Sequence, residues 1–231
     1  MRPVGILGGM GPEATILLMQ KVLGAVQARD DADHIPLIVH QNPQVPSRIA
    51  ALIEGQGADP GPALAQMARD LQAAGAAALA MPCNTAHHYA DTVRAASTLP
   101  FLDMLALSAE TLQAAGATRI GMLASPATRL TGVFDAPFAA HRLTPVWLQD
   151  EAALLAIIRA VKAGEGADTL RPRLAACGAA LRAQGADHLL VACTELSLMT
   201  DALGEHGPVT DTLDCLVRAI TAFAQGDSAA Q

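Results

Sequence analysis

Two cysteines, Cys83 and Cys193, occupy the same kind of position in the sequence and could move protons as a pair. Each follows a short apolar run, at 76–80 and 188–192, that is typical of a buried strand, and each precedes a segment that predicts a helix. The unpaired N–H groups and the dipole at the start of a helix stabilise a thiolate and a bound carboxylate. One such cysteine could be a buried structural residue, but the second copy favours a functional pair.

Two thiols that face each other across a cleft suit a few reactions. One is a disulfide, which needs sulfur atoms about 2.05 Å apart. Another is removal of a proton from one face of a carbon and return of a proton to the opposite face, for which the sulfur atoms lie roughly 7 Å apart. In that reaction one cysteine is a thiolate and the other a thiol, and they exchange roles with direction. Backbone N–H groups after each cysteine would stabilise the charged planar intermediate.

The surroundings of the two cysteines are repeated along the chain, which indicates an internal duplication. A strand, a turn of small residues and a helix that starts with proline begin at residue 3, and the same pattern begins again at residue 119. From Gly8 to Cys83 is 83 − 8 = 75 positions, and from Ala124 to Cys193 is 193 − 124 = 69. Each copy therefore has a turn followed about 70 positions later by a strand-end cysteine.

Short apolar runs and longer helical stretches alternate through the chain. The expected strands are 3–7, 35–40, 76–80, 99–104, 119–123, 143–147 and 188–192, and the main expected helices are 12–28, 61–74, 86–96, 108–115, 151–163, 169–184 and 212–224. This alternation predicts an α/β protein of two pseudosymmetric lobes, each a doubly wound parallel sheet with right-handed crossovers. The lobes are expected at 1–104 plus 209–231, with 226–231 as a frayed tail, and at 105–208. Ligands bind beyond the carboxyl ends of such strands, so the active site is expected in the cleft between the lobes.

Composition and charge narrow the class of protein. The chain has 231 residues, 52% hydrophobic and only 3% aromatic, so small aliphatic side chains must form the cores. A net charge of −7 argues against nucleic acid or an acidic membrane surface as a partner. We expect no secretory signal, because the first residues lead directly into a short strand, and no membrane span, because the sequence has no apolar run of about 18 residues. Its cysteines show no CxxC or metal-binding spacing. A cytoplasmic protein with reduced thiols and no bound metal is expected, with Cys177 and Cys215 packed inside helices.

Several other positions have competing interpretations. The first turn has the spacing GGxG rather than GxGxxG, which argues against a dinucleotide site. Arg48 ends a polar loop, where it could bind a ligand or simply be a solvated loop residue. Lys162 lies in the last turn of a helix, where a cation is favoured by the helix dipole even if it binds no ligand. His87 and His88 could tune Cys83, but their position favours exposed helical histidines.

The motifs, in their order and spacing, resemble those of the aspartate/glutamate racemase superfamily, and within it the aspartate racemase branch. The resemblance rests on GILGGMGP at 5–12, PCNTAH at 82–87 and CTE at 193–195, and it covers essentially the whole chain. Such proteins are cofactor-independent racemases with two pseudosymmetric α/β lobes. Glutamate racemases carry Asp-Ser-Gly in the first turn and Cys-Thr-His at the second cysteine, where this chain has Gly-Gly-Met and Cys-Thr-Glu.

The resemblance implies that Cys83 and Cys193 are the acid/base residues that interconvert L- and D-aspartate, or glutamate. It implies no metal, no PLP and no other cofactor, a small dicarboxylic amino acid as the partner, and a homodimer. It also implies a set of substrate-binding residues, with Asn84, Thr85 and Thr194 at the α-carboxylate and amine, Arg48 and Lys162 at the side-chain carboxylate, and Met10, Gln44, Ser125, Thr128 and Glu195 around them.

Two alternatives stay open. Maleate cis–trans isomerase, arylmalonate decarboxylase and hydantoin racemase share the fold and keep one or both strand-end cysteines. A regulator or redox sensor without catalytic activity would instead use the cysteine pair as a reversible disulfide. The GGMGP turn, together with Arg48 and Lys162, favours a dicarboxylic amino acid as the substrate.

Overall fold

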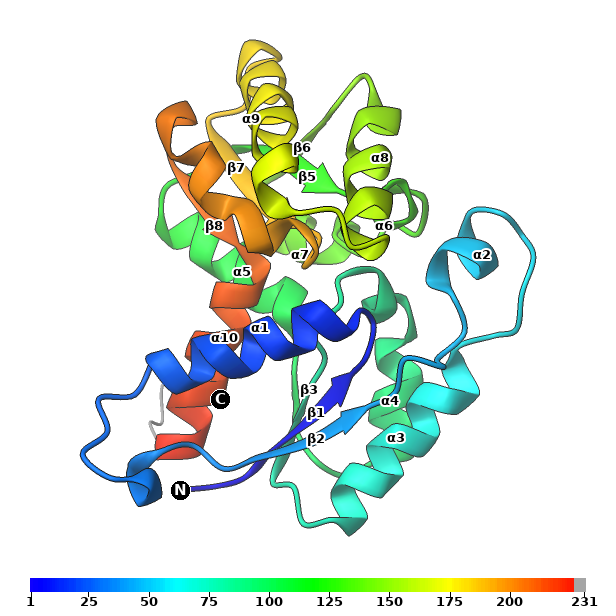
Figure 1. Cartoon of the computed structure of the whole chain (residues 1–231), viewed down its shortest axis with the longest axis vertical. Coiled ribbons are helices and arrows are strands. Elements are labelled where there is room, and N and C mark those ends of the chain that lie inside the picture. Colours follow the sequence, from blue (N-terminus) through cyan, green and yellow to red (C-terminus); the bar gives the residue numbers. More distant parts are fainter. Residues whose placement is uncertain (227–231) are drawn as a thin grey trace. The chain divides into compact units, whose positions relative to one another are not determined.

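The structure of the protein is a computed structural model that describes residues 1–226; of the tail expected at 226–231, residues 227–231 lie outside the described residues. The chain divides into two compact units. Unit 1 is Met1–Met104 together with the segment that begins at Leu213, and unit 2 is Leu105–Thr212. Each unit contains one four-stranded parallel sheet with flanking helices (Figure 1), which confirms the α/β prediction.

In unit 1 the strand order is β2-β1-β3-β4, so the chain first moves one way across the sheet and then the other. Figure 1 shows α1 and α10 on one side of this sheet and α3 and α4 on the other, which is the doubly wound arrangement. β1 is buried along its whole length, as expected for a central parallel strand. The elements are β1 (Val4–Gly8), α1 (Pro12–Gly24), η1 (Asp31–Asp33), β2 (Leu37–Gln41), α2 (Arg48–Leu52), α3 (Gly61–Ala73), β3 (Ala78–Ala80), η2 (Thr85–Tyr89), α4 (Ala90–Ala96), β4 (Phe101–Leu102) and α10 (Thr212–Gln225).

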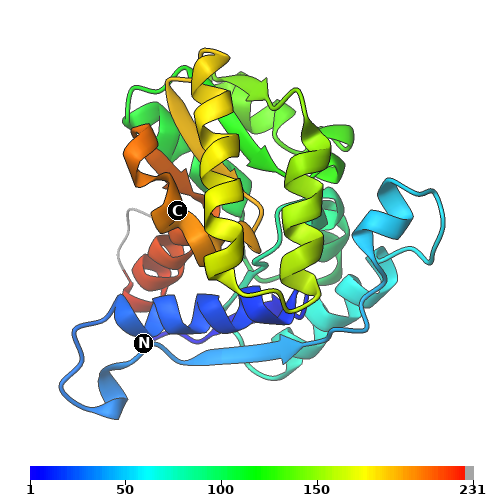
Figure 2. The ribbon, with the colours of Figure 1, turned by 45° about the horizontal axis from the view of Figure 1, so that its top comes forward.

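Unit 2 repeats this topology with the order β6-β5-β7-β8. Its helices α8 and α9 run side by side over the sheet (Figure 2) and supply much of an aliphatic core that includes Leu154, Ile157 and Leu181. The elements are α5 (Met104–Ala114), β5 (Arg119–Ala124), α6 (Pro126–Leu130), α7 (Asp135–His141), β6 (Thr144–Trp147), α8 (Glu151–Lys162), α9 (Ala167–Ala183), β7 (His188–Ala192), η3 (Leu196–His206) and β8 (Val209–Asp211).

Equivalent glycines in the central strands of the two sheets reveal how closely the halves correspond. A Cβ atom on Gly5 of β1 would lie 2.9 Å from the Cβ of Ala76, and one on Gly121 of β5 would lie 3.0 Å from the Cβ of Ala186. The residues around the two glycines recur at a separation of 110 positions, namely Leu71 and Leu181, Ala76 and Ala186, and Leu79 and Leu189. Cys83 and Cys193 have the same separation, 193 − 83 = 110. The two cysteines are therefore equivalent positions of one repeated fold.

The structure corrects several predicted boundaries. The expected strand 99–104 is reduced to β4, and α5 begins at Met104 rather than at 108. β8 is not among the expected strands, yet it pairs with β7 in parallel, with Val209 opposite Leu189. Because of this pairing, residues 209–212 belong to unit 2 and not to the first lobe.

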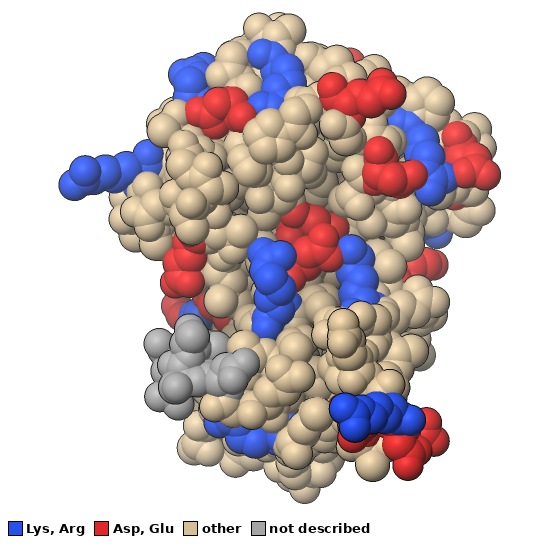
Figure 3. All heavy atoms as spheres, turned by 90° about the vertical axis from the view of Figure 1, so that its left-hand side faces the viewer, with Lys and Arg blue, Asp and Glu red and all other residues tan. Residues whose placement is uncertain are grey.

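Charged side chains are sparse and of mixed sign on the face shown in Figure 3, where basic residues are interspersed with acidic ones. The whole sequence has 15 Lys and Arg against 22 Asp and Glu. Within residues 1–226, no helix combines the length and the apolar character that crossing a membrane requires.

Candidate active site

Cys83 lies in a buried loop directly beyond β3. Its backbone N–H donates to the carbonyl oxygen of Met81 at 2.8 Å, which closes a tight turn. The residue is only 7% exposed and joins an apolar cluster of unit 1 that contains Leu7, Met10 and Val45. Met10, expected to line the site, thus forms part of the apolar surroundings of Cys83.

The segment after Cys83 is not the α-helix start that the sequence predicts. It is the short 3-10 segment η2, and α4 begins only at Ala90. Asn84 occupies the N-cap of η2, but in the described chain its side chain makes no capping hydrogen bond there. Asn84 is buried and Thr85 is half-buried. Because the turn is short, a helix dipole contributes little here, and nearby polar groups matter more.

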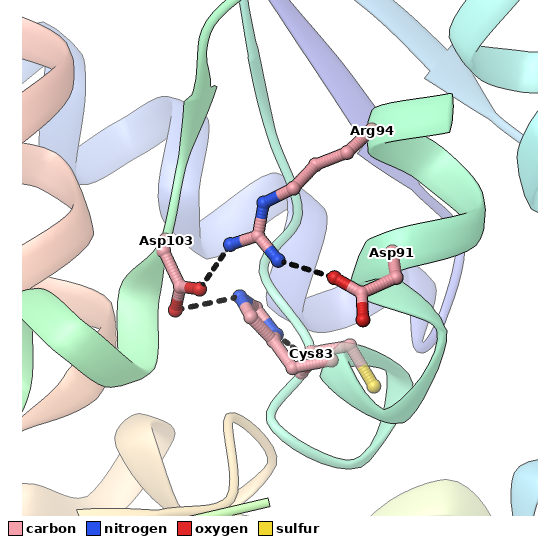
Figure 4. A network of polar contacts seen from close by, with 5 residues as sticks. Cys83, Asp91, Arg94 and Asp103 are labelled. Atoms are coloured by element: carbon pink, nitrogen blue, oxygen red, sulfur yellow. Dashed lines mark hydrogen bonds and ion pairs between the residues drawn. The ribbon is translucent and has the colours of Figure 1, made fainter. Parts of the chain in front are cut away.

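His87 ties the Cys83 turn to the end of β4 (Figure 4). Its Nδ1 lies 2.8 Å from the carbonyl oxygen of Cys83, and because a carbonyl only accepts, Nδ1 carries the proton and donates it. Its Nε2 lies 3.9 Å from Oδ1 of Asp103, whose other oxygen accepts from Nη2 of Arg94 at 2.5 Å. The side chain of His87 is only 1% exposed, so the prediction that it is an exposed histidine is wrong. His88 is exposed, as predicted.

The environment of His87 keeps its ring neutral. Burial lowers the pKa of His87 below the usual 6.5, although the neighbouring carboxylate of Asp103 opposes this shift. A neutral ring with its proton on Nδ1 is a fixed hydrogen-bond donor to the Cys83 loop. His87 therefore positions this loop at neutral pH.

We expect His87 to make the protein less stable as the pH falls below 6.5. Its pKa is lower in the folded state, so the unfolded chain binds the proton first, and stability is lost from pH 6.5 down to the folded-state pKa. His87→Gln removes this titration and the bond to Cys83. The free energy of unfolding at neutral pH should therefore fall by about 1–3 kcal/mol, and its decline with acidification should become shallower. Urea unfolding across this pH range measures both effects.

The matched control is His88→Gln, because His88 is the exposed neighbour of His87. This variant should keep the wild-type slope of stability against pH. His188, whose pKa burial also lowers, adds the same slope to all three proteins and cancels in the comparison. An H87Q slope equal to that of the wild type would contradict the prediction.

Cys193 follows β7 as Cys83 follows β3, but its thiol has a carboxylate partner. Its Sγ donates to Oε2 of Glu195 at 3.1 Å, and Oε1 of Glu195 is paired with Nζ of Lys162. Cys193, Thr194 and Glu195 are all buried, while Lys162 is exposed and reaches across from the last turn of α8, where the sequence predicts it. The structure thus brings two of the expected site residues, Lys162 and Glu195, to the second cysteine.

Each cysteine turn is tied to the last strand of its own sheet. Four residues after Cys193, Ser197 donates from Oγ to Oδ1 of Asp211 at 2.8 Å, just as His87 approaches Asp103 in unit 1. β3 pairs with β4 as β7 pairs with β8, which places the two aspartates at equivalent positions. Both turns are therefore held by the same kind of contact, made by different side chains.

A hydroxyl group closes the turn after the first strand of each sheet. In unit 1, Oγ1 of Thr15 accepts from the backbone N–H of Gly9 at 2.9 Å, and Pro12 begins α1 as predicted. In unit 2, Oγ of Ser125 accepts from the backbone N–H of Thr128 at 3.3 Å and lies 3.0 Å from its Oγ1. Ser125 and Thr128 are both buried, so these two expected site residues also hold their own turn.

Arg48 begins α2 and folds back over its own loop. Its Nη1 donates to the carbonyl oxygen of Pro46 at 3.0 Å. The same Nη1 lies 3.4 Å from the carbonyl oxygen of Val45, a residue of the apolar cluster that contains Cys83. Gln44 is exposed in the same loop. These contacts place Arg48 on the side of unit 1 where Cys83 lies.

His87, Asp103 and Arg94 are the site residues that the sequence does not predict as a group. The spacing of four residues between Cys83 and His87 was the available signal, because one helical turn brings a side chain back to such a carbonyl. Within residues 1–226, no group of three or more His, Cys, Asp and Glu side chains is arranged to hold a metal ion. The groups that could take part in a reaction are therefore the thiols of Cys83 and Cys193, each with hydrogen-bonding groups nearby.

Two α/β units of one topology, each with a buried cysteine beyond its third strand, define the two-lobed racemase fold. The family described as Asp/Glu/Hydantoin racemase matches residues 7–220, and the chain belongs to this family. The protein is accordingly an isomerase, an amino-acid racemase of the Asp/Glu racemase type.

Similar proteins agree with this assignment over nearly the whole chain. The structure of the Picrophilus torridus aspartate racemase matches with a TM-score of 0.88 and 28% identity, covering 97% of this chain and 95% of that one. The broad specificity amino-acid racemase RacX of Bacillus subtilis (strain 168) is 25% identical over 226 residues, which are 94% of this chain and 95% of RacX. A glutamate racemase from Francisella tularensis, with a TM-score of 0.65 at 12% identity over 98% of this chain and 82% of that one, shares the fold.

Proposed function

We propose that the protein interconverts L- and D-aspartate, or glutamate, without a cofactor, and that Cys83 and Cys193 are its two acid/base residues. The observation that carries the proposal is the equivalence of the two thiols. They stand 110 positions apart at the same point of a duplicated fold, each buried beyond a third strand. A racemase needs two such groups, because the proton leaves one face of Cα and returns to the other.

The proposed reaction keeps its protons and electrons in balance. The thiolate of one cysteine takes the α-proton, and the electron pair of the C–H bond passes into the α-carboxylate of the substrate. The thiol of the other cysteine then donates its proton to the opposite face, which leaves one thiol and one thiolate with their roles exchanged. Backbone N–H groups in the two cysteine turns stabilise the charged intermediate.

The proposed substrate is dicarboxylic because of the charged groups near the cysteines. Arg48 supplies a cation beside Val45, which belongs to the same apolar cluster as Cys83, and we assign the side-chain carboxylate of the substrate to it. Asn84, Thr85 and Thr194 would bind the α-carboxylate and amine, with Met10, Gln44, Ser125 and Thr128 as lining residues. The aspartate racemase of Picrophilus torridus supports aspartate, whereas RacX supports a broader range of amino acids.

The proposal is tested by incubating the purified protein with L-aspartate in D2O without any added cofactor. Deuterium should enter at Cα while optical rotation decays towards zero, and L-glutamate and L-alanine should be compared at the same concentration. Retention of the α-proton with every amino acid would refute the proposal. A panel of maleate, arylmalonate and hydantoins distinguishes the other enzymes with this fold.

We expect Arg48→Met to raise the KM for aspartate by about 10- to 100-fold, the value of one charge-assisted hydrogen bond. Turnover of alanine, which has no side-chain carboxylate, should change little, so the ratio of kcat/KM values isolates the contact. Arg69→Met is the matched control, because Arg69 is an exposed arginine of α3 that contacts Gln66. An equal loss with aspartate and alanine would show that Arg48 supports only its own loop.

We also propose a homodimer, after the family resemblance, and a cytoplasmic location, where reducing conditions keep the cysteines as thiols. Light scattering during size-exclusion chromatography measures the mass of the assembly. A monomer that racemises at full rate would overturn the dimer.

A further inference from the structure

Glu195 is a buried carboxylate that touches the sulfur of Cys193. Its side chain is 8% exposed, and its two oxygens have different partners. Oε2 accepts the thiol proton of Cys193 at 3.1 Å, and Oε1 pairs with the ammonium group of Lys162. A buried carboxylate is costly unless it is paired and hydrogen-bonded, and these two contacts meet that requirement.

The duplicated fold does not itself require a carboxylate at this position. Glu195 is two residues after Cys193, and the equivalent residue after Cys83 is Thr85, since 195 − 85 = 110. Both residues stand at the same point of a cysteine turn that leads into a 3-10 segment. Glu195 sits at the N-cap of η3, and within the described chain its side chain makes no capping hydrogen bond there. Its carboxylate is therefore directed to Cys193 and Lys162 instead of to the turn.

We propose that Glu195 holds the proton of Cys193 when no substrate is bound, while Lys162 pairs with the other oxygen of its carboxylate. An ionised carboxylate accepts a hydrogen bond from a thiol but repels a thiolate, so this contact favours the protonated form of Cys193. Another charged group near this turn, Asp211 of β8, accepts a hydrogen bond from Ser197. Glu195 is a positioning residue here, because it acts on the reacting carbon only through Cys193.

Together with the proposed function, this inference assigns a resting state to the enzyme. Cys193 begins as the thiol and so as the proton donor, and the enantiomer whose α-proton faces Cys193 must wait for that proton to move. Lys162 then acts through Glu195 on the second cysteine, in addition to any contact with the substrate.

The proposal is tested on the thiol itself, in the absence of substrate. The full-length protein is partly alkylated with iodoacetamide over a range of pH, and peptide mass spectrometry gives the rate at Cys193. In Glu195→Gln the rate-against-pH curve for Cys193 should move to lower pH, and the rate at neutral pH should rise by about tenfold, the equivalent of one pKa unit. Glu195→Asp retains the charge and should restore a curve close to that of the wild type.

Glu151→Gln is the matched control, because Glu151 is also an acid of unit 2 that pairs with a cation, in this case Arg129. It should leave the Cys193 curve unchanged. A curve for E195Q that stays in place or moves to higher pH, with circular dichroism showing an intact fold, would overturn the inference. This measurement uses no substrate, so its outcome is independent of the deuterium-exchange experiment. An unchanged E195Q curve would refute the role of Glu195 even if exchange supports the racemase, and a shifted curve would support that role even if exchange refutes the racemase.

Discussion

Cys193→Ala should racemise aspartate about 10²- to 10⁴-fold more slowly than the wild type, the usual contribution of an acid/base group, and yet still exchange the α-proton of one enantiomer. The remaining thiol of Cys83 can remove a proton from the face it reaches and return a deuteron from solvent to the same face. This gives exchange without inversion. Cys83→Ala should show the same behaviour with the opposite enantiomer. The measurement is proton NMR of L- and D-aspartate in D2O, combined with chiral chromatography.

The pattern of exchange identifies two bases more sharply than a loss of activity does. Cys177→Ala is the control, because Cys177 packs inside α9 and burial raises the pKa of its thiol, which keeps it protonated and unreactive. This variant should racemise at close to the wild-type rate. If both active-site variants exchanged the same enantiomer, or if either still racemised at the wild-type rate, the two-base mechanism would be wrong.

The central strands could be predicted from the sequence because a strand that is buried on both faces consists of consecutive apolar residues. β7 is observed at His188–Ala192, the predicted range, and β1 is displaced by a single residue from its prediction. β4 and β8 could not be bounded in the same way, since they have two and three residues and exist because a neighbouring strand pairs with them. Partner-dependent strands of this length carry little periodicity of their own.

The cysteines could be found from the sequence because each marks a change from strand to turn, but the contacts that their partners make could not. Glu195 and Lys162 are 33 positions apart, and only the packing of α8 beside the β7 turn brings them together. His87 was expected to be exposed because the segment 86–96 suggested a continuous helix. The 3-10 turn η2 instead directs its ring inward, where Nδ1 meets Cys83.

Gly9→Ala should lower the free energy of unfolding by about 3 kcal/mol or more, one of the largest effects of any single methyl group in this protein. Gly9 has a φ of +93°, which an L-residue with a side chain rarely adopts, and an added Cβ would lie 2.4 Å from the backbone carbon of Asn42. Backbone atoms of Asn42 cannot move aside easily, because its N–H donates to the carbonyl oxygen of Gly8 at 3.2 Å. The extra methyl group must therefore displace the turn between β1 and α1.

Gly24→Ala separates this effect from the general cost or benefit of replacing glycine. Gly24 is the last residue of α1, and a Cβ there would meet nothing within 4 Å. Alanine at this position should raise stability by up to about 1 kcal/mol, because it restricts the unfolded chain. Urea unfolding of the two variants should thus give changes of opposite sign. A Gly9→Ala protein as stable as the wild type would contradict this prediction, because it would mean that the turn can adopt a second conformation. The left-handed conformation of Gly9 would then not be what holds Met10 beside Cys83.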